Sequence, residues 1–206
     1  MYDEGYKKSY NIDFARNVIH YMKQKNKRLR SSMIFETMNA LDIEYEDEQF
    51  DIIFDKATFD CILCDIQANK KAKIYMDEIY RLLKPKGYFF MISNSEPENR
   101  NKYLLKKGYK FNILVHKIEN DEKDVKYFDM LDYNLNYLKK THYFRFKIIP
   151  FIPKSIDYAN YADKNYWLQR YENVNCSYEW YDDYETIKPI ISDLNLPKRC
   201  VIIDLF

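Results

Sequence analysis

The stretch Phe-Asp-Ile-Ile-Phe-Asp-Lys-Ala-Thr-Phe-Asp, residues 50–60, decides the fold class of this chain. Its first five residues are a short, mostly apolar run that leads directly into Asp55. Runs of this length and composition are typical of strands that are buried on both faces, as the strands of parallel sheets are. The stretch therefore favours an α/β protein, in which helices cover a largely parallel sheet.

Helical and strand-like patterns alternate on both sides of this stretch. Apolar residues at helical spacing from Ile74 to Leu83 predict a helix that stops at the Lys-Pro-Lys-Gly turn of residues 84–87, before a strand at residues 88–93. The other predicted elements are strands at residues 10–13, 33–38, 111–118, 143–149 and 200–205, and helices at residues 14–27 and around residues 187–194.

This alternation predicts a mostly parallel sheet of about seven strands with helices on both faces. In open sheets of this kind, ligands bind at the carboxyl ends of the strands. We therefore expect Asp13, residues 38–40 and residues 55–58 to line one crevice.

Length, charge and cysteine content restrict the class of protein. A chain of 206 residues is enough for one compact domain and hardly enough for two. The formal net charge of +1 gives no sign of nucleic-acid binding. No segment resembles a signal peptide or a membrane span, so we expect a cytoplasmic protein with no membrane partner. Cys61 and Cys64 have no second cysteine pair or histidine cluster to complete a metal site, and we expect buried thiols.

Four blocks of sequence together carry a family resemblance. They are residues 11–14 (Asn-Ile-Asp-Phe), 36–40 (Glu-Thr-Met-Asn-Ala), 50–60 and 81–87 (Arg-Leu-Leu-Lys-Pro-Lys-Gly). These blocks resemble the central and C-terminal parts of class I S-adenosylmethionine-dependent methyltransferases, specifically the group of the elongation factor one-alpha lysine methyltransferases. The pattern Asp-Lys-x-Thr-x-Asp at residues 55–60 is the most specific of them, whereas Leu-Leu-Lys-Pro-x-Gly is general to the class.

Residues 151–206 resemble the opening segment of the same family, in the blocks at residues 166–171, 178–181 and 201–205. In the family, the strand that matches residues 201–205 runs into a glycine-rich loop, and the counterpart of the residues after that loop begins here at Met1. The resemblance implies one Rossmann-like domain over residues 1–206, circularly permuted, with residues 1–150 as the central and C-terminal part and both termini at the cofactor loop. It also implies that residues 200–205 form a central parallel strand beside residues 10–13.

Three histories account for this order of blocks. The domain is permuted, or the chain spans the join between two tandem methyltransferase copies, or the gene model is faulty or truncated. The sequence does not choose among them.

The resemblance implies that the chain binds S-adenosylmethionine through residues at the strand ends. Asp13 would accept hydrogen bonds from the ribose hydroxyls, although it is also placed to cap a strand end. Phe14 offers adenine a flat face and is equally placed to pack in the core. Asn39 and Ala40 would lie at the adenine, with the Asn39 amide oxygen as an acceptor. Lys56 matches a position near the cofactor, or is a solvated loop lysine.

Trp167, Tyr171 and Trp180 match family aromatics that close over the cofactor. Aromatic faces attract a cation such as the sulfonium, by about 0.5–2 kcal/mol. The alternative is an aromatic cluster that only packs on the sheet. If the three side chains do serve the site, they should gather over the carboxyl ends of the strands, within about 15 Å of Asp13.

The implied function is methyl transfer from S-adenosylmethionine, with the side chain of a protein lysine as the expected acceptor and a protein as the expected partner. The alternative is a non-catalytic methyltransferase-like binding module or a gene fragment. The chain contains only Gly5, Gly87 and Gly108, so it has no glycine-rich loop through which backbone could approach the cofactor. We therefore expect the 206-residue chain to bind S-adenosylmethionine poorly, with the remaining affinity dependent on Asp13.

Overall fold

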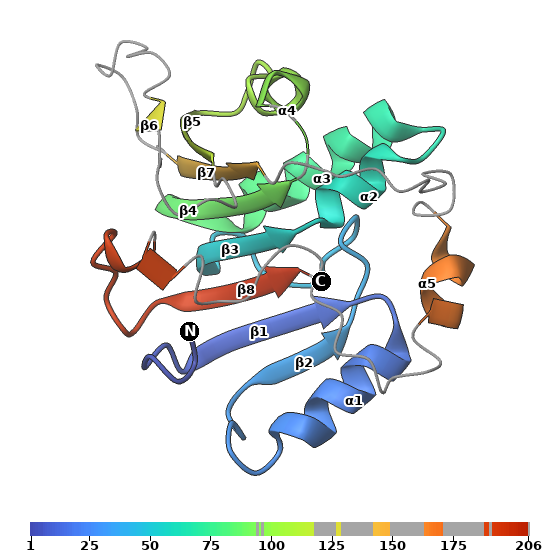
Figure 1. The fold of residues 1–206 in the computed structure, drawn as a ribbon, viewed down its shortest axis with the longest axis vertical. Helices are drawn as coiled ribbons and strands as arrows, with labels where there is room; N and C mark the ends of the chain where they lie inside the picture. The colour runs from blue at the N-terminus through green and yellow to red at the C-terminus, as the bar shows by residue number, and fades with distance from the viewer. Residues whose placement is uncertain are drawn as a thin grey trace.

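We analysed a computed structural model of the chain, shown in Figure 1. The structure describes residues 1–93, 95, 97–117, 127–128, 142–148, 163–170, 188–189 and 191–205. Tyr171, Trp180 and Phe206 lie outside the described residues, as does most of the predicted insertion at residues 119–141.

A single sheet organises the described part of the chain. The strands in order across the sheet are β2 (Ile34–Thr37), β1 (Lys8–Asp13), β8 (Val201–Leu205), β3 (Phe50–Lys56), β4 (Leu83–Ser93), β7 (His142–Ile148), β5 (Phe111–Lys117) and β6 (Tyr127–Phe128). All neighbouring pairs are parallel except β5 and β6. The expected parallel sheet is confirmed, and it has eight strands because the two-residue strand β6 adds to β5.

Strand β8 lies in the middle of this sheet. It pairs with β1 on one side, with Ile12 opposite Leu205, and with β3 on the other side, with Asp55 opposite Leu205. The expected position of residues 200–205 beside residues 10–13 is therefore confirmed. This placement brings the carboxyl ends of β1, β8 and β3 to the same edge of the sheet, as Figure 1 shows.

The start of the chain lies at the opposite edge. Because β1 and β8 run parallel with Lys8 opposite Val201, the residues before β1 lie at the amino ends of the strands (Figure 1). There the Tyr6 hydroxyl donates to the carbonyl of Leu196 at 3.3 Å. The expectation that both termini lie at the cofactor loop is wrong for residue Met1, since a parallel neighbour of β8 cannot begin where β8 ends.

Helices and further segments cover the sheet. The helices are α1 (Arg16–Asn26), α2 (Thr58–Leu63), α3 (Ala68–Leu82), α4 (Pro97–Leu104) and α5 (Lys164–Arg170). Helix α2 was not anticipated, and β4 begins at Leu83, five residues earlier than expected, so the Lys-Pro-Lys-Gly turn lies inside the strand's bounds. Within the described residues, no helix has both the length and the apolar character to cross a membrane.

The core has two layers, one on each face of the sheet. On one face, Ile53 of β3 packs in a cluster with Met76 and Ile79 of α3. On the other face, Ile52 packs in a second cluster that includes Ile191. Successive residues of a strand point to opposite faces, so this alternation in β3 confirms the strand buried on both sides that its sequence predicts.

Candidate functional site

The loops that leave the carboxyl ends of the strands are tied to one another. The Met38 amide donates to the carbonyl of Asp13 at 2.9 Å, which joins the end of β2 to the end of β1. The Thr58 hydroxyl donates to the carbonyl of Leu205 at 3.2 Å, which joins the start of α2 to the end of β8. These contacts bring the predicted residues at the ends of β1, β2 and β3 to one edge of the sheet.

Asp13 ends β1 at this edge and is 5% exposed. Within the described residues, one hydrogen bond reaches its carboxylate, from the Ala15 amide to Oδ1 at 2.7 Å. Burial raises the pKa of Asp13 to about 7, because the charged form loses its hydration, and the hydrogen bond from Ala15 opposes this only in part. A buried carboxylate with so few donors has the capacity to accept hydrogen bonds from a ligand.

Phe14 and Ala15 connect β1 to α1. Phe14 lies in a bend and is half-buried, whereas Ala15 is fully buried. The placement of Phe14 against adenine stays a prediction. Because the Ala15 amide donates to Asp13, the carboxylate also orders the approach to the first turn of α1. Asp13 therefore caps the end of its strand, as considered above, and its carboxylate can still accept further hydrogen bonds.

Asn39 and Ala40 follow β2 in a turn where Asn39 is exposed and Ala40 is half-buried against the core. The Leu41 amide donates to Oδ1 of Asn39 at 3.0 Å, and the Asp42 amide donates to the Asn39 carbonyl at 2.9 Å. The Asn39 side chain is exposed, and its carbonyl oxygen has a second lone pair beyond the one that Leu41 engages.

Lys56 ends β3 and is half-buried. It precedes Ala57, whose φ of 72° lies in the left-handed region that residues with a Cβ adopt at a cost of about 1–2 kcal/mol. The Ala57 amide donates to the carbonyl of Ile92 at 3.1 Å, which holds this turn against the end of β4. The turn redirects the chain from β3 into α2.

Asp55 differs from the expectation that residues 55–58 line the crevice. Its side chain is 1% exposed, and the Tyr75 hydroxyl of α3 donates to it at 2.7 Å. The Phe59 amide also donates to this carboxylate, at 3.1 Å to Oδ2. Burial raises the pKa of Asp55 to about 7, and the hydrogen bond from Tyr75 is the largest effect that lowers it. Asp55 therefore serves the packing of α2 and α3 on the sheet.

Asp60, at the start of α2, is also part of the scaffold. Nη2 of Arg100, on α4, lies 2.6 Å from Oδ1 of Asp60, and both side chains are largely buried. The Ser93 hydroxyl lies 2.5 Å from the same oxygen. This cluster joins α4 and the end of β4 to α2.

Among the three expected aromatic residues, only Trp167 falls within the described residues. It lies on α5, is buried and makes an edge-to-face contact with Tyr166 at a ring-centre distance of 5.2 Å. In Figure 1, α5 lies beyond the arrowheads of the parallel strands, on the side of their carboxyl ends. Tyr171 and Trp180 lie outside the described residues, so the gathering of all three over this edge stays a prediction.

The residues at this edge match the ribose and adenine parts of S-adenosylmethionine better than its methionine part. Asp13 and Asn39 offer acceptors for hydroxyl and amino groups. The glycines, by contrast, lie away from the edge: Gly5 precedes β1, Gly87 lies near the start of β4, and Gly108 precedes β5. Within the described residues, no group of three or more metal-binding side chains is present.

Two sets of contacts were missed in the sequence, one at the carboxyl ends of the strands and one near the amino ends of β3 and β4. Tyr75, the partner of Asp55, shares the buried face of α3 with Ala72 and Met76, and its spacing is the signal that could have placed it against the sheet. Arg81 is the second: it holds the loop after β2, and its partners include backbone carbonyls, which leave no sequence pattern.

Comparison with known proteins agrees with this geometry. A methyltransferase domain family matches residues 2–166. The human eEF1A lysine and N-terminal methyltransferase is 28% identical over 130 residues, which cover 61% of this chain and 18% of the human protein. The mouse protein of the same name is 31% identical over 110 residues, covering 52% of this chain and 15% of its own length. The homologue from Drosophila pseudoobscura pseudoobscura is 34% identical over 95 residues, which cover 45% of this chain and 14% of the fly protein.

These relatives are much longer than the segment that they share with this chain, which spans less than a fifth of each. The family match, by contrast, covers most of the 206 residues. It includes the strand ends that carry Asp13, Asn39 and Lys56. The chain belongs to the methyltransferase domain family.

Proposed function

We propose that this domain transfers a methyl group from S-adenosylmethionine to the side chain of a protein lysine. The observation that carries the proposal is Asp13: a buried carboxylate at the carboxyl end of a strand next to the central strand β8, with one described hydrogen bond. The family match supports the methyl-transfer chemistry. The named substrate of the relatives, eEF1A, supports a protein acceptor.

In this proposal each predicted residue has a role in binding the cofactor. Asp13 accepts hydrogen bonds from the ribose hydroxyls, Phe14 lies against the adenine face, and Asn39 with Ala40 borders the adenine amino group. Lys56 lies near the cofactor at the end of β3. The aromatic residues Trp167, Tyr171 and Trp180 face the sulfonium in this proposal. Of these, Trp167 lies on α5, which Figure 1 shows on the side of the carboxyl ends of the strands.

The chemistry requires positioning more than acid–base catalysis. S-adenosylmethionine supplies a methyl group on a positively charged sulfur, and the acceptor nitrogen must attack in line as the carbon–sulfur bond breaks. A lysine acceptor must first lose a proton, and an apolar aromatic entrance lowers its pKa through desolvation. The proposed role of α5 and the segment after it is to provide such an entrance.

We also propose that residues 1–206 form one domain with its blocks in permuted order, residues 151–206 acting as the counterpart of the family's opening segment. The position of β8 between β1 and β3 supports this. A join between tandem copies and a faulty gene model would give the same order. Sequencing the transcript across codons 1 and 206 distinguishes them: continuous reading into further methyltransferase blocks on either side would contradict the permutation.

A specific observation favours a second candidate, a non-catalytic methyltransferase-like module. None of the three glycines in the chain lies at the carboxyl edge of the sheet. Backbone amides cannot then approach the methionine carboxylate closely, and each lost hydrogen bond to a charged group costs about 1.5–3 kcal/mol. We therefore expect the 206-residue chain by itself to bind the cofactor weakly.

Calorimetric titration of the purified chain with S-adenosylmethionine tests both proposals. The expected result is a dissociation constant well above micromolar that becomes unmeasurable in Asp13→Ala. Micromolar binding by the intact chain would show that a glycine-rich loop is dispensable. Equal binding by the variant would contradict the ribose assignment.

Transfer of a radioactive methyl group to purified eEF1A, at a cofactor concentration that saturates the site, separates the enzyme from the module. Label that appears on eEF1A lysine and disappears with Asp13→Ala supports the enzyme. Cofactor binding without any label on eEF1A or on other proteins of a cell extract supports the module.

A further inference from the structure

The loop that carries Asn39 and Ala40 is held by contacts next to its tip and by others farther along it. This β2–β3 loop, residues 38–49, connects the end of β2 to the start of β3. At its tip, residues 39–42 form a tight turn closed by the hydrogen bonds to Asn39. Beyond the turn, Ile43 is buried in the core cluster beneath α3. The tip is thus held on its near side, where the Met38 amide donates to the carbonyl of Asp13, and on its far side at Ile43 and the residues after it.

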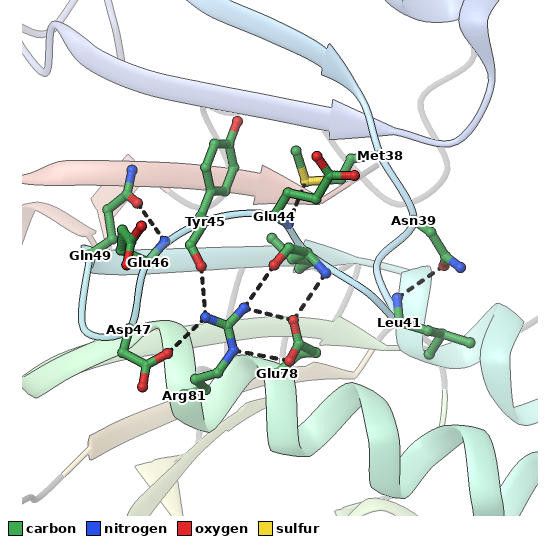
Figure 2. Close-up of polar contacts among 11 residues, drawn as sticks. Met38, Asn39, Leu41, Glu44, Tyr45, Glu46, Asp47, Gln49, Glu78 and Arg81 are labelled. Carbon is green, nitrogen blue, oxygen red and sulfur yellow. Dashed lines mark hydrogen bonds and ion pairs between the residues drawn. The ribbon is translucent and has the colours of Figure 1, made fainter.

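Arg81 of α3 holds that part of the loop, as Figure 2 shows. Its Nη2 donates to the carbonyl of Ile43 at 2.8 Å, and its Nη1 donates to the carbonyl of Tyr45 at 2.7 Å and to Asp47 at 2.9 Å. Its Nε and Nη2 also donate to the two carboxylate oxygens of Glu78, at 3.0 and 2.8 Å. These five bonds match the five N–H donors of a guanidinium, and the three donors of a lysine cannot reproduce them.

Glu78 completes the attachment from the same helix. Its Oε2 accepts a hydrogen bond from the Ile43 amide at 3.0 Å. The two side chains of α3 thus hold both polar groups of Ile43, the amide through Glu78 and the carbonyl through Arg81. The hydrogen bond with Glu78 raises the pKa of Arg81, so the guanidinium keeps its charge.

Two further contacts hold the residues on either side of the turn at the tip. The Glu44 amide lies 3.3 Å from the sulfur of Met38, which draws the two ends of the turn together. On the other side, the Tyr45 hydroxyl donates to Glu36 of β2. The turn with Asn39 is therefore enclosed by contacts to β2 before it and to α3 after it.

We propose that Arg81 is a positioning residue for adenine recognition: by fixing Ile43 and Tyr45, it holds the turn of Asn39 and Ala40 in the place where the adenine amino group binds. This inference rests on the proposed function. Arg81 acts through the loop, because its hydrogen bonds to Ile43 and Tyr45 reach their backbone carbonyls.

The test compares two ligands that differ at the adenine amino group, S-adenosylhomocysteine and S-inosylhomocysteine, by NMR titration. In Arg81→Lys we expect the preference for the adenine ligand to fall about fivefold to tenfold. Glu78→Gln keeps an acceptor for the Ile43 amide, so the preference for the adenine ligand should fall less than in Arg81→Lys. The matched control is Lys84→Gln, which removes an ion pair with Asp51 at 2.9 Å outside the loop and should leave the preference unchanged.

A double-variant cycle with Asn39→Ala identifies the route of the effect. If Arg81 acts through Asn39, Arg81→Lys causes no further loss of adenine preference in the Asn39→Ala background. Equal loss of both ligands in Arg81→Lys, or additive effects in the cycle, would overturn the inference and leave Arg81 as a stabilising residue only. If the unaltered chain binds neither ligand, the proposed function fails and the inference fails with it.

Discussion

The carboxyl ends of β1 and β3 each carry an aspartate that burial brings to a pKa of about 7, yet the two differ in their hydrogen bonds. Asp55 accepts from the Tyr75 hydroxyl and from the Phe59 amide, and is 1% exposed. Asp13 accepts, within the described residues, from the Ala15 amide alone, and is 5% exposed. The two carboxylates therefore differ in the number of protein donors that they accept from. Asp55 binds groups of α2 and α3, whereas Asp13 has capacity to accept hydrogen bonds from a ligand.

The largest expected effect concerns stability and pH. Both aspartates have a pKa of about 7 in the folded chain, against an ordinary value of 3.8. Between about pH 4 and pH 7 the folded state therefore binds more protons than the unfolded state, so the free energy of unfolding falls as the pH rises. Asp55→Asn removes the contribution of one of these carboxyls to this loss. Between pH 4 and pH 8, the free energy of unfolding of the variant should therefore rise relative to that of the unaltered chain by at most about 4 kcal/mol.

Urea unfolding of both proteins across this pH range measures the difference. Asp13→Asn in the absence of ligand should behave in the same way, because burial also raises the pKa of Asp13. A stability difference that stays constant from pH 4 to pH 8 would contradict the assignment of a raised pKa to either residue.

The next effect, on cofactor binding, should distinguish the two acids sharply. Asp13→Asn replaces charge-assisted hydrogen bonds to the ribose with neutral ones, a loss of about 2–3 kcal/mol or about 30- to 150-fold in affinity for S-adenosylhomocysteine. Asp55→Asn, the same substitution at the paired position, should change the affinity less than about threefold. Calorimetry or NMR titration compares them, and equal losses at both positions would remove the distinction between the two strand ends.

A smaller effect is expected from Tyr75→Phe. The substitution removes the hydroxyl that donates to Asp55 and should destabilise the chain by about 1–2 kcal/mol at pH 8, where Asp55 is charged, and by less at pH 5. The matched control is Tyr103→Phe, which removes a hydroxyl that donates to the amide oxygen of Asn69 and should cost a similar amount at both pH values. Loss of pH dependence in Tyr75→Phe would indicate that Asp55 stays neutral throughout.

The sheet could be predicted from the sequence because its strands are short apolar runs with clear ends. The run at residues 50–54 and the run at residues 200–205 are strands β3 and β8, and the family resemblance placed the second beside residues 10–13. The start of β4 was predicted too late because Pro85 and Gly87 indicate a turn, whereas pairing of Leu83 with Phe50 across an irregular register already begins the strand there.

The candidate site was predictable only in outline. Strand-end rules find Asp13 and Asp55 alike, since both lie at the end of a predicted strand and both reach the same edge. The feature that distinguishes them is Tyr75, which is 20 positions from Asp55 along the chain, and such a contact depends on how α3 packs. The contacts of Arg81 were also out of reach, because carbonyls of any residue type can accept them.

The most direct test of the account is to follow the two carboxylates themselves by carbon-13 NMR, titrating pH with and without saturating S-adenosylhomocysteine. If ribose hydroxyls donate to Asp13, the ligand stabilises its charged form, and the pKa should fall from about 7 to about 6 or below. The pKa of Asp55 should stay where it is, because Tyr75 and Phe59 already surround it. A ligand-induced change at Asp55 with none at Asp13, or no change at either despite binding, would contradict the proposed site.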